Sequence, residues 1–251
     1  MRCDITDYLQ QIKYDAKGVP YASAQQLNNF ATAVINEFSP DVLKEPDSVR
    51  IEDLAEFHCH ANLEIRSITQ DKSILGATLF NGGCIKVYDD GWTPVQFPKR
   101  TILIEEDMKF NKQIGRYRFT LAHEISHLLL HSGANCSTGT ISRNATENET
   151  VIMCRPGESI SNRTKPQSTA DWLEWQADRM AAALLMPEPT FKYVVEVFMK
   201  NSGAGSIAEI KYMIDKNWSN VTDELLFKLG QIFEVSKTAA RYRLRDCGYS
   251  K

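Results

Sequence analysis

Two histidines four residues apart, in an otherwise apolar segment, constrain this chain more than any other feature of its sequence. Residues 116–131 read RYRFTLAHEISHLLLH, with apolar side chains at a helical spacing. A helix places His123 and His127 on one face, where both imidazoles can reach one metal ion. Glu124 lies beside them and can accept a proton from water on that metal. The HExxH pattern therefore predicts a buried metal-binding helix, because burying these groups without partners is costly.

A catalytic zinc ion needs a third protein ligand and one open position. Glu174 is our candidate, on a second strong helical segment at residues 171–186. Asp178 follows one turn later on the same face, where it could orient a ligand histidine from behind. Two structural interpretations stay open at this point. The two histidines could be core residues that hydrogen-bond to backbone groups, and Glu174 could face solvent on an amphipathic helix.

Two other kinds of third ligand compete with that candidate. His131 is eight residues from His123, a rise of about 12 Å, which is too far for both to bind one metal from a straight helix. Cys136 would need a tight reversal of the chain. Cys154 could reach the metal if the polar stretch at residues 132–170 folds over the site. We therefore predict a site of two histidines and one glutamate, which suits hydrolysis better than a closed structural site.

The composition is that of an ordinary globular protein, with 43% hydrophobic and 24% charged residues, so a disordered chain is excluded. The net charge of −3 is too balanced for the whole molecule to bind phosphate backbones. No apolar stretch approaches the ~20 residues of a membrane span, and the N-terminus does not read as a signal peptide. Six cysteines without a CxxC pair are expected to be reduced. We therefore expect a cytoplasmic protein without membrane contact.

The pattern of the remaining chain predicts an α+β fold with N-terminal helices and a small antiparallel sheet. Helical spacing occurs at residues 23–38, 50–61 and near 189–200. Short β-rich segments lie between turn residues at 63–68, 76–80, 84–89 and 101–106. Pro94 to Pro98 is interpreted as a turn, and 151–154 as a short strand within the irregular stretch. The predicted division is an N-terminal helical segment (1–48), a metallopeptidase domain (49–201) and a C-terminal helical segment (206–251).

The C-terminal segment reads as helix, short turn, helix, with caps expected at Thr222 and Ser236. Three basic residues recur every four positions along its last helix: Lys237, Arg241 and Arg245. This stripe is similar to a helix-turn-helix and could contact nucleic-acid phosphate or a protein partner. The competing interpretation is a helical subdomain that packs on the rest of the chain, with its basic side in solvent.

The two strongest helices resemble the ImmA/IrrE family of metallopeptidases. The matching residues are RFTLAHEISH at 118–127 and EWQAD at 174–178, followed by AAALLMP at 181–187. Ser126 stands where the family usually has glycine. The resemblance implies a zincin-like fold, zinc held by His123, His127 and Glu174, and Glu124 as general base.

Family members of known role cleave helix-turn-helix repressors of mobile elements or stress genes. The resemblance therefore implies a zinc endopeptidase with one specific cytoplasmic protein as substrate. The alternative from another functional class is a non-enzymatic DNA- or repressor-binding regulator, in which the metal site is structural or vestigial. That alternative depends on the basic stripe of the C-terminal helix.

Overall fold

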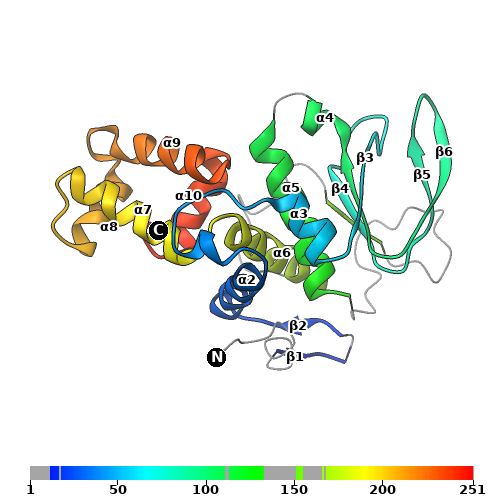
Figure 1. Ribbon diagram of the computed structural model, residues 1–251, viewed down its shortest axis with the longest axis horizontal. Coiled ribbons are helices and arrows are strands. Elements are labelled where there is room, and N and C mark those ends of the chain that lie inside the picture. The colour runs from blue at the N-terminus through cyan, green and yellow to red at the C-terminus, as the bar shows by residue number, and fades with distance from the viewer. Residues whose placement is uncertain are drawn as a thin grey trace.

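The computed structural model describes residues 12–250 except for 17, 111–112, 133–150, 155–165 and 167. These residues form a mixed α+β structure. Figure 1 shows the strands of the central part of the chain at one end, the C-terminal helices at the other end, and long helices between them. None of the helices in the described ranges is long and apolar enough to cross a bilayer.

The three long helices occur where the helical spacing predicted them: α2 (Ala24–Phe38), α5 (Ile114–Leu130) and α6 (Thr169–Leu185). Serine caps begin two of them. The hydroxyls of Ser23 and Ser168 accept hydrogen bonds from the backbone N–H groups of Gln26 and Asp171. The side chains of Gln26 and Asp171 accept in return from the serine N–H groups. Each capping box satisfies donors that have no partner within the helix. Helix α6 packs against both α2 and α5.

Shorter elements lie before and after the long helices. Strands β1 (Lys13–Tyr14) and β2 (Pro20–Tyr21) form a small antiparallel hairpin before α2, and η1 (Pro40–Leu43) follows it. The helix predicted at 50–61 is α3 (Ile51–Asp53), which continues as a π-helical turn, η2 (Leu54–His58). A short helix, α4 (Glu106–Phe110), precedes α5.

The main sheet has the order β3–β7–β4–β8, formed by β3 (Asn62–Arg66), β7 (Thr101–Glu105), β4 (Gly76–Leu79) and β8 (Val151–Cys154). Strand β4 is antiparallel to β7 and to β8, but β3 runs parallel to β7, from Asn62 beside Thr101 to Arg66 beside Glu105. The expectation of a wholly antiparallel sheet was therefore wrong. The long connection between β3 and β7 allows the parallel pair, which no two-residue turn could form.

A separate hairpin, β5 (Gly83–Tyr88) and β6 (Trp92–Phe97), packs beside the main sheet. Strand β6 includes Pro94, so the prediction of a turn from Pro94 onward was wrong. Both strands of a two-stranded hairpin are edge strands, where a residue without an N–H is tolerated.

The central strands β4 and β7 are buried on both faces. Ile102 and Ile104 of β7 belong to the large core shared with α5, whereas Leu103 belongs to a smaller core shared with the β5–β6 hairpin. This alternation follows the two-residue period of a strand. On β4, Thr78 faces α5, and its neighbours Ala77 and Leu79 join the hairpin core.

The C-terminal helices are α7 (Glu188–Asn201), α8 (Ile207–Lys216), α9 (Val221–Phe233) and α10 (Lys237–Asp246), with η3 (Trp218–Asn220) before α9. Ser236 caps α10, as predicted, by accepting from the N–H of Ala239 at 3.1 Å. Thr222 is not a cap: it lies inside α9, which begins after Asn220, and its hydroxyl donates to the carbonyl of Ile214. Two helices joined by a short turn occur where they were predicted. Their likeness to a DNA-binding helix-turn-helix and the three-part division of the chain stay predictions.

The N-terminal end of α5 lies against the turn between α9 and α10. A Cβ atom on Gly115 would lie 2.7 Å from the backbone nitrogen of Ser236, so only glycine permits this approach. One turn later, the buried guanidinium of Arg118 donates to the carbonyl of Val49 at 2.7 Å and pairs with Glu234 at 3.3 Å. Arg118 therefore joins the first turns of α5 to the segment before α3 and to the turn before α10.

Candidate metal centre

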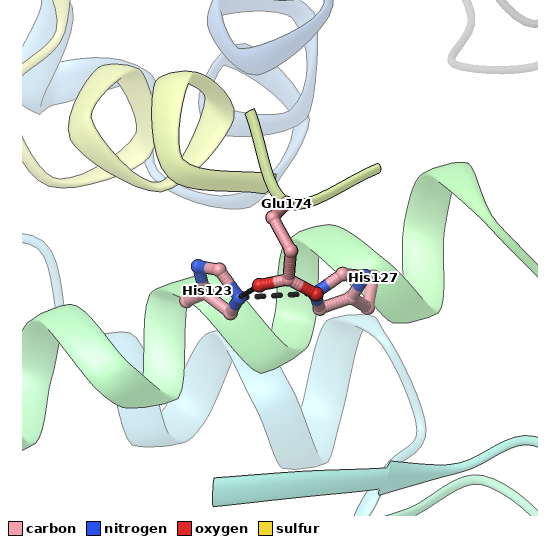
Figure 2. A group of neighbouring side chains, drawn as sticks. All are labelled: His123, His127 and Glu174. Atoms are coloured by element: carbon pink, nitrogen blue, oxygen red, sulfur yellow. Dashed lines mark hydrogen bonds and ion pairs between the residues drawn. The ribbon is translucent and has the colours of Figure 1, made fainter. Parts of the chain in front are cut away.

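The structure brings the three predicted ligands together between α5 and α6. His123 and His127 are buried on α5, and Glu174 reaches them from α6. Figure 2 shows the two imidazoles and the carboxylate pointing toward one another. The two Nε2 atoms are 2.9 Å apart, and the Glu174 oxygens lie 3.2 Å from Nε2 of His123 and 3.5 Å from Nε2 of His127. One ligand atom from each residue lies within 4.8 Å of the other two.

Asp178 lies behind His123, as its position one turn after Glu174 predicted. Its Oδ1 is 2.9 Å from Nδ1 of His123, and both side chains are buried. A carboxylate only accepts, so Nδ1 donates this bond. Nε2 of a neutral His123 then carries a lone pair toward Glu174.

His131 lies behind His127 and outside the group of three. Its Nδ1 is 2.8 Å from Nδ1 of His127, and its Nε2 is 3.0 Å from Oε1 of Gln176 on α6. Burial lowers the pKa of His127 well below its usual value and that of His131 to about 4. Both rings are therefore neutral near pH 7, and each keeps one nitrogen able to accept.

Glu124 lies beside this group, buried completely against strand β4. The hydroxyl of Thr78 donates to its Oε2 at 2.7 Å. Its Oε1 has no hydrogen-bond partner within the described part of the chain. Burial raises the pKa of Glu124 to about 7, and attraction to His123 and the Thr78 bond oppose that rise. A carboxyl group with one hydrogen-bonded oxygen, one oxygen without such a bond and a pKa near neutrality can accept and release a proton.

Gly76 makes room for this carboxylate. A Cβ atom at residue 76 would lie 2.6 Å from Oε1 of Glu124 and 2.9 Å from the methyl group of Thr120. Sequence reasoning did not assign Gly76 or Thr78 to the site. An isolated glycine in a buried strand is a signal of close approach by another group, although it does not say which group approaches.

The donor atoms fit a divalent cation. Two imidazole nitrogens and a carboxylate oxygen converge, and hydrogen bonds to the far nitrogens leave lone pairs facing inward. Such acceptors repel one another unless a cation lies between them. Nitrogen and oxygen ligands in this number suit zinc with one open position. Glu174, with 17% of its side chain exposed, is the most accessible of the three.

The other predicted residues lie elsewhere. Lys237, Arg241 and Arg245 are exposed on α10. The ammonium group of Lys237 lies over the ring of Phe227, and the guanidinium group of Arg245 lies over the ring of Tyr242. The guanidinium group of Arg241 is 3.8 Å from the carboxylate of Asp223. Contact of this stripe with nucleic acid stays a prediction. Cys136 lies outside the described residues, and the backbone of Cys154 pairs with that of Gly76.

Comparison with known proteins gives one family. A peptidase family model described as the IrrE N-terminal-like domain matches residues 88–245, well over half of the chain. The matched range includes α5, α6 and the helices up to α10, and it begins after β4. A search of curated proteins gave no match.

Proposed function

The chain belongs to the IrrE N-terminal-like family of peptidases, and from this premise we propose that it is a zinc-dependent endopeptidase. In this proposal His123, His127 and Glu174 hold the zinc ion, and Glu124 is the general base. The observation that carries it is the convergence of three ligand atoms beside a buried carboxylate, one oxygen of which has no hydrogen-bond partner among the described residues.

Zinc held by these residues would polarise the scissile carbonyl and make a water molecule more acidic. The protein supplies the proton transfers. Oε1 of Glu124 accepts a proton from the attacking water and returns it to the leaving amine. Thr78 holds the other oxygen, so the carboxylate keeps its orientation during both transfers. Asp178 keeps the ring of His123 in place from behind.

We further propose that the substrate is one specific cytoplasmic protein, a helix-turn-helix transcriptional repressor of a mobile element or a stress regulon. The support for this substrate is the family resemblance of residues 118–127 and 174–187. A regulator of this kind would cut one bond in its repressor and release transcription.

Co-expression with the repressor encoded beside this protein tests the proposal, with the products identified by intact mass. We expect wild-type protein to carry stoichiometric zinc and to yield two fragments. Glu124→Gln should keep zinc and yield none, because the amide cannot accept the proton. Glu45→Gln, at an exposed carboxylate, is the matched control and should cleave normally. Complete cleavage by zinc-loaded Glu124→Gln protein would show that Glu124 is not the base.

A further inference from the structure

A series of hydrogen bonds connects His127 to the N-terminal hairpin. His127 contacts His131, and His131 contacts Oε1 of Gln176. Nε2 of Gln176 then donates to the carbonyl of Pro20 in β2, at 2.6 Å. His127, His131 and Gln176 are all at most 1% exposed. The series therefore joins α5, α6 and the hairpin within the protein interior.

The Pro20 carbonyl fixes the direction of this series. A carbonyl oxygen only accepts, and Trp172 also donates to it, at 3.2 Å. The amide nitrogen of Gln176 must therefore face Pro20, which leaves the amide oxygen facing His131. An amide oxygen also only accepts, so Nε2 of His131 carries a proton.

The same reasoning continues to the metal centre. Both hydrogen-bond partners of His131 are uncharged, and a buried charge without a charged partner is costly, so His131 is neutral. Its second nitrogen, Nδ1, then accepts, and Nδ1 of His127 must donate. Nε2 of His127 is left with its lone pair toward Glu174.

We infer that His131 and Gln176 are positioning residues, which hold His127 in the Nδ1-protonated form and so prepare its Nε2 to bind metal. This inference rests on the proposed metal-binding role of His127. The two histidine ligands are then held differently: a carboxylate supports His123, and a neutral relay ending at a backbone carbonyl supports His127. The relay orients its histidine without adding another negative charge to the buried site.

Two variants of the full-length protein break the relay with little change in volume. Gln176→Met removes both the donor and the acceptor of the amide, and His131→Phe keeps a ring without nitrogen. Ser126→Ala is the matched control, since it removes a buried hydroxyl of the same helix that, among the described residues, bonds to the Ala122 carbonyl alone. We expect zinc affinity, measured by competition with a chelator, to fall about 10- to 100-fold in both relay variants. The control should stay within about twofold of wild type.

Nitrogen-15 spectra of the histidine rings in metal-free protein supply a second measurement, one that a merely structural role would not change. We expect His127 of the wild type to be protonated at Nδ1, and this preference to be lost in Gln176→Met. Protonation at Nε2 in the wild type would overturn the inference, as would wild-type zinc affinity in both folded variants. If wild-type protein binds no zinc but shows the Nδ1 form, the proposed function fails while the assignment of the relay is supported. If a variant does not fold, the wild-type spectrum still decides.

Discussion

The hydroxyl of Thr78 donates to Oε2 of Glu124 at 2.7 Å, so the central strand β4 orients this carboxylate of helix α5. The other oxygen of this carboxylate lacks a partner in the described ranges. One oxygen is therefore held and the other is left for chemistry. The strand thus contributes to the site without supplying a metal ligand.

Thr78→Val removes this hydrogen bond with almost no change in side-chain volume. We expect repressor cleavage to slow about 10- to 100-fold, the effect of losing a hydrogen bond to a charged group, while zinc content stays stoichiometric. Thr78→Ser keeps the hydroxyl and should retain most of the rate. The test is to measure cleavage rates of these proteins after their zinc content has been determined. A wild-type rate in Thr78→Val would contradict the role of Thr78.

Gly76→Ala should reduce cleavage while leaving the fold intact. The added methyl group would lie 2.6 Å from Oε1 of Glu124, the oxygen proposed to carry the proton, so the carboxylate must move. Overpacking of this kind costs about 1–3 kcal/mol of stability. Gly205→Ala, at an exposed glycine next to α8, is the control. Thermal unfolding and cleavage should be measured together, and full activity in Gly76→Ala would refute the predicted clash.

Removing Glu174 and removing Asp178 should affect zinc to different degrees. Glu174→Ala deletes a proposed ligand and should abolish stoichiometric zinc. Asp178→Ala leaves the three ligands in place but frees the ring of His123, so zinc affinity should fall about 10- to 100-fold. Cys154→Ser should retain zinc. Elemental analysis and chelator competition measure these effects, and stoichiometric zinc in Glu174→Ala protein would mean that another residue is the third ligand.

Glu105 should make stability depend on pH. Its carboxyl group is buried, accepts from the N–H of Ile68 at 2.9 Å, and has a pKa raised by burial. The folded state therefore holds this proton to a higher pH than the unfolded chain does. The resulting stabilisation is complete below the unfolded pKa of about 4.3 and is lost as pH rises through the folded pKa. In urea unfolding, the wild type should lose stability relative to Glu105→Gln as pH rises from 4 to 7. If the free energy of unfolding changed with pH in the same way for both proteins, this effect would be excluded.

Local patterns in the sequence were sufficient to predict which side chains converge at the candidate metal centre. The spacing of His123, His127, Glu174 and Asp178 depends only on the geometry of two helices, and a helix is a local structure. The serine cap of α10 was likewise predictable from Ser236 alone. The arrangement of these residues agrees with the prediction because α6 packs along α5 with the predicted face inward.

Pairings between distant segments were not predictable in the same way. A two-residue alternation of apolar and polar residues indicates a strand but not which other strand it pairs with. The parallel pair of β3 and β7 was therefore missed. For the same reason, nothing in the sequence connected Thr78 or Gly76 with Glu124, or Gln176 with Pro20. Pro94 was interpreted as a turn residue because its place in an edge strand depends on which strand pairs with it.

The close approach of Gly115 to Ser236 also bears on the order in which the contacts of α5 form during synthesis. The ribosome makes α5, which carries His123 and His127, before it makes the turn between α9 and α10 that contacts the first residues of that helix. This support, together with the pairing of Arg118 and Glu234, can form only after residues 234–236 have been synthesised. A nascent or truncated chain that ends before this turn therefore carries the HExxH residues without the final support of their helix.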